Sequence, residues 1–100
     1  MSAEIRYTHK ALCELDEIYD YINYHLCNPQ AAYNIVNDIM LAVDRLAEFP
    51  NLGKSVVLPF NVFDYRFLVC HKYTIFYHIE DDIWIDRIIY GRRDLKKVFT

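Results

Sequence analysis

Apolar residues recur with two different periods along the chain, and the change of period divides it into a helical and a strand-forming part. Between residues 9 and 49 the apolar positions are three and four apart, as on one side of α-helices. Between residues 62 and 90, runs of β-branched and aromatic residues are separated by short polar breaks, which is typical of an antiparallel meander. An alternating segment at 4–8 precedes the helices and predicts a first strand.

The helical part predicts two antiparallel helices joined by a tight connection. Thr8 can cap the first helix, which must end near Cys27 because the residue before a proline avoids the helical conformation. Asn28 and Pro29 then suit the cap and first turn of the second helix, and Phe49-Pro50-Asn51-Leu52-Gly53 ends it. The tyrosines of this part are expected in the seam between the helices, at Tyr19, Tyr21, Tyr24 and Tyr33.

The strand-forming part predicts strands at 62–69, 73–80 and 83–90, and residues 56–58 before Pro59 form an edge segment or a loop. The fold class is therefore α+β, in one domain spanning residues 1–100. An N-terminal strand leads into a two-helix antiparallel hairpin, packed on one face of a mainly antiparallel sheet of three or four strands, and a short C-terminal tail follows. This chain offers nothing to cover the opposite face, which is expected to meet a partner.

Composition is that of a folded protein rather than a disordered one. Of the 100 residues 54% are hydrophobic and 25% are charged. No apolar run reaches the about 20 residues of a membrane helix, and the N-terminus does not resemble a signal peptide, so a cytoplasmic location is expected. Cys13, Cys27 and Cys70 show no paired spacing, and with the four histidines they form no metal-binding pattern. We therefore expect reduced thiols, and neither a metal nor a cofactor.

Charge is unevenly divided between the two halves of the chain. Residues 1–53 carry three basic and eight acidic side chains, whereas residues 54–100 carry eight basic and six acidic ones. Arg92 and Arg93 directly follow the last strand and are candidates for a working surface, unless Asp94 simply pairs with one of them. Arg66 lies in an apolar strand and needs a partner, for which Asp64 and Asp86 are the local choices. Trp84 is expected in the core or as an interface anchor.

The ordered set of motifs resembles the RelE/ParE superfamily of bacterial toxins. The motifs are Leu15-Asp16-Glu17-Ile18 in the first helix, Asn28-Pro29-Gln30-Ala31-Ala32, Phe49-Pro50-Asn51-Leu52-Gly53, Tyr73-Thr74-Ile75-Phe76-Tyr77 and Ile88-Ile89-Tyr90-Gly91-Arg92-Arg93-Asp94. The resemblance implies a toxin held silent by a co-expressed antitoxin, in a toxin–antitoxin hetero-oligomer. Members either cut mRNA on the ribosome or poison DNA gyrase.

Two departures from the superfamily pattern weigh against ribonuclease activity. Cleavage requires proton-transfer groups and cations, and only Arg66 and Arg93 match the family's cations. Thr74 stands where an arginine is usual, and Phe99 stands where a proton-transferring tyrosine is usual. In a ribonuclease, the substitutes would be His71, His78 or Tyr90, although the histidines are more often surface or core-edge residues.

The long helices and the opening of the second one resemble the ParE branch and favour gyrase poisoning. The target contact is then expected at Arg66, Arg92, Arg93, Lys96, Lys97 and Phe99. The alternatives are an mRNA endoribonuclease and an inert, antitoxin-binding member of the superfamily.

Overall fold

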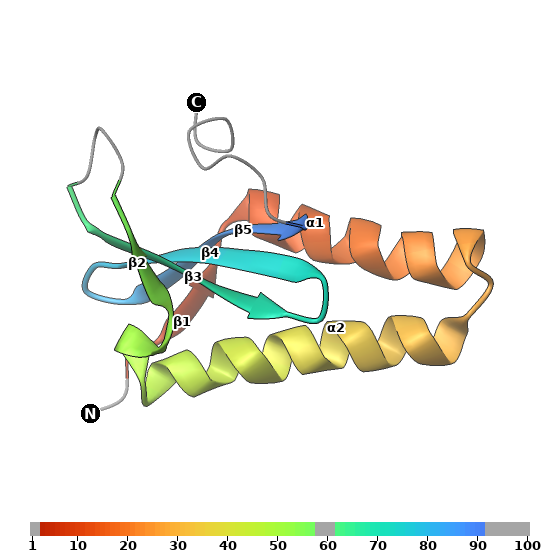
Figure 1. The fold of residues 1–100 in the computed structure, drawn as a ribbon, viewed down its shortest axis with the longest axis horizontal. Helices are drawn as coiled ribbons and strands as arrows, with labels where there is room; N and C mark the ends of the chain where they lie inside the picture. The colour runs from red at the N-terminus through yellow and green to blue at the C-terminus, as the bar shows by residue number, and fades with distance from the viewer. Residues whose placement is uncertain (1–2, 58–61, 92–100) are drawn as a thin grey trace.

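The computed structural model describes residues 3–57 and 62–91. Its helices are α1 (His9–Asp20) and α2 (Pro29–Asp44), with a π-helical turn η1 (Tyr21–His25) and 3-10 turns η2 (Arg45–Ala47) and η3 (Pro50–Leu52). Its strands are β1 (Ile5–Tyr7), β2 (Lys54–Val56), β3 (Asp64–Cys70), β4 (Tyr73–Ile79) and β5 (Ile83–Tyr90). The predicted α+β class, with an N-terminal strand and a helical hairpin on a mainly antiparallel sheet, is confirmed (Figure 1).

The sheet has five strands in the order β1-β5-β4-β3-β2, more than the three or four predicted. The predicted meander is present as β3, β4 and β5, all paired antiparallel. The additional strands join at the edges: β1 runs parallel to β5, and β2 pairs with the first half of β3. Of the edge segment or loop expected at residues 56–58, only Val56 belongs to β2, which begins at Lys54. Val57 follows the strand, and Leu58 lies outside the described residues.

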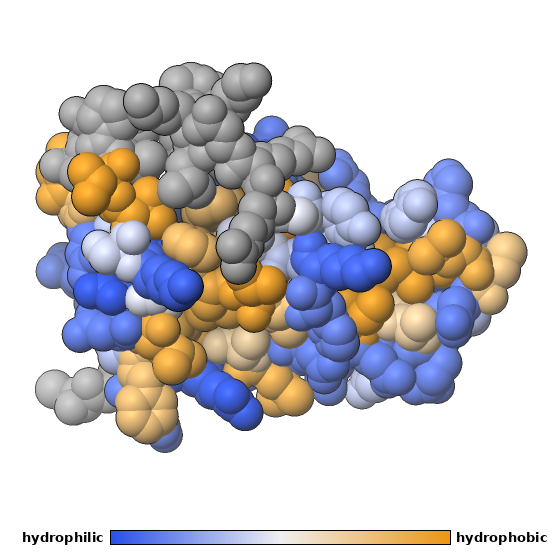
Figure 2. Space-filling model, viewed as in Figure 1, coloured by the Kyte–Doolittle hydropathy of each residue, from blue (hydrophilic) through white to orange (hydrophobic). Residues whose placement is uncertain are grey.

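Both predicted helix caps are present. The Thr8 Oγ1 accepts a hydrogen bond from the Ala11 N–H at 3.1 Å, and the Asn28 Oδ1 accepts one from the Ala31 N–H at 3.1 Å. Before the connection, α1 widens into the π-helical turn, and Cys27 reverses the chain in the left-handed conformation at a φ of 49°. The hairpin extends past the end of the sheet (Figure 1). On the face of the molecule seen in Figure 2, hydrophobic residues gather on the hairpin and near the centre of the molecule.

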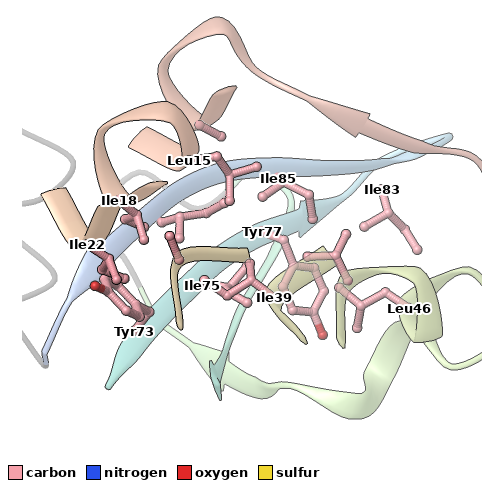
Figure 3. Packing of buried hydrophobic residues seen from close by; sticks show 14 residues of the cluster. Leu15, Ile18, Ile22, Ile39, Leu46, Tyr73, Ile75, Tyr77, Ile83 and Ile85 are labelled. Carbon is pink, nitrogen blue, oxygen red and sulfur yellow. The ribbon is translucent and has the colours of Figure 1, made fainter. Parts of the chain in front are cut away.

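The core lies between the helices and one face of the sheet (Figure 3). Tyr73, Ile75 and Tyr77 of β4 point to this side, as their alternation predicts. Side chains from both helices and from β5 complete it, among them Leu15, Ile18, Ile22, Ile39, Leu46, Ile83 and Ile85. In β5, the neighbours Ile88 and Ile89 point to opposite faces and are both buried, and Ile88 belongs to the core.

The opposite face of the sheet is not bare, contrary to the sequence prediction. Thr74 and Phe76 of β4 are each 2% exposed, and Ile89 of β5 is 5% exposed. Large side chains of adjacent strands pack on one another here, with the rings of Phe67 and Phe76 6.0 Å apart. The Thr74 hydroxyl also donates to the Gly91 carbonyl at 2.7 Å.

The tyrosines expected in the seam between the helices are not buried there. Tyr19, Tyr21, Tyr24 and Tyr33 are 38–70% exposed, whereas aliphatic residues such as Ile18 and Ile39 fill the space between the helices and the sheet. Trp84 is half-buried on the far face, where the Arg6 guanidinium carbon lies 5.8 Å from the centre of its ring.

Candidate functional site

A groove with a volume of about 1180 Å³ lies between α1 and the ends of β4 and β5. The start of α2 and the β3–β4 turn close its other sides. Its wall is largely apolar, with Ile18, Ile22, Ile35, Tyr73 and Ile88 among the lining residues. Charged side chains also line it, and they are Lys10, Glu14, Glu17, Lys72 and Arg87. An apolar groove with charges at its margins suits a peptide segment better than a small polar metabolite.

Glu14 joins α1 to the open edge of β5 at this groove. Because β1 pairs only with residues 83–85, the second half of β5 has no strand beside it on that side. The Glu14 carboxylate accepts the Ile88 N–H at 3.0 Å, and the Arg87 Nε and Nη2 at 3.1 and 2.9 Å. The sequence analysis did not identify Glu14 as a site residue. The signal it missed is Arg87, an arginine in an apolar strand that requires a carboxylate.

Arg66 is held by the protein itself. Its Nε donates to both carboxylate oxygens of Asp64 at 3.1 Å, and its Nη1 donates to the carbonyls of Asn51 and Gly53 at 3.3 and 2.9 Å. The ion pair between Arg66 and Asp64, one of the two predicted choices, is therefore present. The Arg66 side chain is 20% exposed.

Tyr77 fixes the same turn from the core. Its hydroxyl donates to the Pro50 carbonyl at 2.8 Å and accepts from the Gly53 N–H at 2.9 Å. A Cβ at Gly53 would lie 2.6 Å from that hydroxyl and 2.7 Å from the Phe67 carbonyl, so only glycine allows this approach. Arg66 and Tyr77 together hold the turn that leads into β2.

His78 lies on the far face of the sheet between two carboxylates. Its Nδ1 is 2.7 Å from the Asp86 Oδ2, and its Nε2 is 3.3 Å from the Glu80 Oε2. The rings of Phe63 and Tyr65 lie 5.2 Å from the imidazole. Burial raises the pKa of Asp86, and the hydrogen bond from His78 opposes that shift.

His71 and Tyr90 lie at the groove end of the sheet. His71 occupies the β3–β4 turn at a φ of 55°, and its Nε2 is 2.7 Å from the Asp38 Oδ2 of α2. Tyr90 is 60% exposed and packs edge-on against Tyr73, with ring centres 5.6 Å apart.

The four described residues predicted as catalytic are not brought together. His78 lies five residues along β4 from Tyr73, or about 17 Å away from the end that carries His71 and Tyr90. Arg66 shares the end of the sheet with His78 but points to the helical side, since its register partner is Tyr77. The other predicted site residues lie outside the described residues, and they are Arg92, Arg93, Lys96, Lys97 and Phe99.

Over residues 3–57 and 62–91, no three histidine, cysteine or acidic side chains are grouped so as to hold a metal ion. In the same residues, no helix has the length and apolar character needed to cross a membrane. The three cysteines are free, and burial raises the pKa of the Cys70 thiol.

Comparison with known proteins agrees with this fold. Residues 5–95 match a family described as the ParE toxin of the type II toxin–antitoxin system parDE. Y4kP of Sinorhizobium fredii, named as a toxin, is 36% identical over 96 residues, which cover 94% of each chain. A solved chain from the chromosomal ParDE system of P. aeruginosa is 26% identical, with a TM-score of 0.75, and the match covers 91% of this chain and 98% of that one. This chain therefore belongs to the ParE toxin family, within the RelE/ParE superfamily.

Proposed function

We propose that this ParE-family toxin arrests growth by binding DNA gyrase, and that a cognate antitoxin neutralises it. The existence of an antitoxin is supported by the similarity to a chain from a ParDE toxin–antitoxin system. We expect the antitoxin to cover the helical hairpin and the apolar groove beside it. Binding to gyrase is a protein–protein contact and requires no catalytic centre.

The arrangement of the polar side chains favours gyrase rather than RNA as the target. A metal-free ribonuclease needs proton-transfer groups beside cations that can meet the phosphate. Arg66 instead donates to Asp64 and to two carbonyls, and His78 lies between Asp86 and Glu80. Asp64, Glu80 and Asp86 make that end of the sheet acidic, which disfavours a polyanionic backbone.

The gyrase contact is assigned to the basic residues that follow β5, namely Arg92, Arg93, Lys96 and Lys97, together with Phe99. These residues supply a net positive segment to a chain that is otherwise acidic. Arg93 is the residue on which we place most weight, because a guanidinium can make bidentate contacts with a carboxylate or a phosphate.

The test is to induce the chain without an antitoxin and to follow DNA supercoiling, DNA breaks and the integrity of translated mRNA in the same cultures. We expect supercoiling to fail and DNA breaks to appear while mRNA stays intact. Purified protein should inhibit gyrase supercoiling, and Arg93→Ala should raise the concentration required about tenfold or more. Arg45→Ala is the matched control, because Arg45 is exposed at the end of the hairpin.

Other outcomes would contradict the proposal in different ways. Cut mRNA with normal supercoiling would identify a ribosome-dependent endoribonuclease. Unaffected growth together with intact antitoxin binding would identify an inert binding module. Full toxicity in a soluble Arg93→Ala variant would remove that residue from the contact.

A further inference from the structure

Cys13 and His9 form a pair of a nucleophile and a base at the start of α1. They are four residues apart and therefore lie on the same side of the helix. The Cys13 Sγ is 3.5 Å from the His9 Nε2, and both residues line the groove. Cys13 is a free thiol that is partly exposed. A thiol in contact with an imidazole that can take its proton is an arrangement that activates cysteine as a nucleophile.

The charges around this pair do not prevent a thiolate from forming. The first turn of α1 contains Lys10 and no acidic residue. The Glu14 carboxylate, next to Cys13 in the sequence, is neutralised by the Arg87 guanidinium of β5. Glu17, one turn beyond Cys13, is exposed to solvent, which screens its charge. The charged side chains that line the groove carry a net charge of +1, and they are Lys10, Glu14, Glu17, Lys72 and Arg87.

The other two thiols have surroundings that favour the protonated form. Cys27 is exposed at the tip of the hairpin, and its Sγ donates a hydrogen bond to the Tyr24 carbonyl at 3.4 Å. Burial, together with the Asp38 carboxylate, raises the pKa of the Cys70 thiol. The order of reactivity expected from these contacts therefore differs from the order of exposure, in which Cys27 would come first.

We propose that Cys13 is a modification site that reacts with small-molecule disulfides, with His9 as its base. The thiol proton passes to the His9 Nε2, and the Cys13 sulfur attacks one sulfur of the reagent. A new bond joins these two sulfurs while the S–S bond of the reagent breaks, and the departing thiolate takes the proton from His9. Cys13 is thereby oxidised to a mixed disulfide, and half of the reagent is reduced to a free thiol.

The adduct would lie in the groove that the proposed function assigns to the antitoxin, and the regulatory consequence rests on that function. A group attached to Cys13 would take space that a bound segment of the antitoxin needs, and reduction by a second thiol would restore it. Oxidation would thus weaken neutralisation of the toxin in a reversible way. The reaction of the thiol itself requires neither gyrase nor an antitoxin, so it is tested on the chain alone.

Two full-length proteins with one cysteine each compare the thiols directly. Cys27→Ser with Cys70→Ser keeps Cys13, whereas Cys13→Ser with Cys70→Ser keeps Cys27. Each protein is mixed with oxidised glutathione, and its increase in mass is followed with time. We expect Cys13 to react about tenfold faster or more than Cys27, and the advantage should disappear in urea, where the contact with His9 is lost. In the unaltered chain, tandem mass spectrometry should find the first adduct on Cys13.

His9→Asn, made in the protein that keeps only Cys13, tests the base. The rate should fall about tenfold or more, and the loss should be larger at about pH 6 than at about pH 8, because no imidazolium is left to stabilise the thiolate. His25→Asn is the matched control, since His25 is an exposed histidine of the same hairpin and stacks on Tyr21 instead. Both variants should react like their parent in urea.

Three results would overturn the proposal. They are equal rates for the two proteins with one cysteine, a first adduct on Cys27 or Cys70 in the unaltered chain, and an unchanged rate in a folded His9→Asn protein. Circular dichroism establishes that the His9→Asn fold is kept. If helix is lost, the comparison between Cys13 and Cys27 decides, because it leaves His9 in place.

Discussion

Two tyrosine hydroxyls in this protein have opposite surroundings. The Tyr77 hydroxyl both donates and accepts hydrogen bonds in the turn before β2. The Tyr7 hydroxyl is buried with no hydrogen-bond partner, and burial, with a smaller contribution from Asp44, raises the pKa of Tyr7 to about 12. An unpartnered buried hydroxyl costs stability, whereas a partnered one holds its neighbours in place.

Tyr77→Phe should therefore lower the free energy of unfolding by about 1–3 kcal/mol, because the Gly53 N–H and the Pro50 carbonyl lose their shared partner. Tyr7→Phe removes the same atom and should leave stability unchanged or raised. Urea denaturation of both variants beside the unaltered protein measures the difference. Equal losses in the two variants would contradict the assignment of hydrogen bonds.

Asp86 gives the stability a dependence on acidity. Its pKa in the folded state is raised above the ordinary 3.8 by burial, so the folded state holds the proton more tightly than the unfolded chain does. The contribution of Asp86 to stability is therefore greatest below the ordinary pKa, and it is lost as pH rises through the raised value. Asp86→Asn removes this dependence.

The measurement is the free energy of unfolding of both proteins between about pH 3 and pH 6, around the ordinary aspartate range. The advantage of the unaltered protein over Asp86→Asn should shrink as pH rises across this interval. A difference that is constant, or that grows with pH, would show that the hydrogen bond with His78 outweighs burial at Asp86.

At the scale of the elements, α1 takes the place of a missing strand along β5. The Thr8 N–H donates to the Ile85 carbonyl at 3.0 Å, the Thr8 hydroxyl donates to the Asp86 carbonyl at 3.1 Å, and Glu14 accepts the Ile88 N–H. The backbone groups along this open edge of β5, which a neighbouring strand would otherwise pair with, are thus bonded to α1 and its cap residue Thr8. This arrangement positions α1 against the groove.

Glu14→Ala should lower the free energy of unfolding by about 1–3 kcal/mol, because a largely buried acceptor of charged and backbone donors is lost. Glu17→Ala, an exposed position on the same helix, should change it by no more than about 0.5 kcal/mol. Hydrogen exchange gives a local readout, since the Ile88 amide should exchange faster only in Glu14→Ala. Unchanged protection of that amide would show that Glu14 does not hold the strand edge.

Local signals predicted the elements better than the contacts between them. The Thr8 and Asn28 caps and the bounds of β5 follow from the residues themselves, because capping and alternation act over a few positions. The parallel pairing of β1 with β5 joins residues nearly eighty positions apart, and no local pattern encodes it. For the same reason the partner of Arg87 was missed, while the near neighbour Asp64 of Arg66 was identified.

At the scale of the whole molecule, the cations bonded within the described residues are not the ones assigned to the target. Arg66 is bonded to the Asp64 carboxylate, and Arg87 is bonded to the Glu14 carboxylate. The hairpin is rich in acidic side chains, and the basic excess of the chain lies in residues 54–100. Under the proposed function, an acidic target surface would meet the basic residues that follow β5, whereas the acidic hairpin would favour partners of positive charge.

These different roles predict that replacing Arg66 by alanine lowers stability, whereas replacing Arg93 by alanine lowers gyrase inhibition. Arg66→Ala should lower the free energy of unfolding by about 1–2 kcal/mol, since the carbonyls of Asn51 and Gly53 lose a donor, and gyrase inhibition per folded molecule should be unchanged. Arg93→Ala should keep its stability and lose inhibition, and Arg45→Ala should keep both. Urea denaturation and a supercoiling assay corrected for folded protein separate the two effects. Loss of inhibition in a fully folded Arg66→Ala protein would place Arg66 in the target contact, as its position in the sequence first indicated.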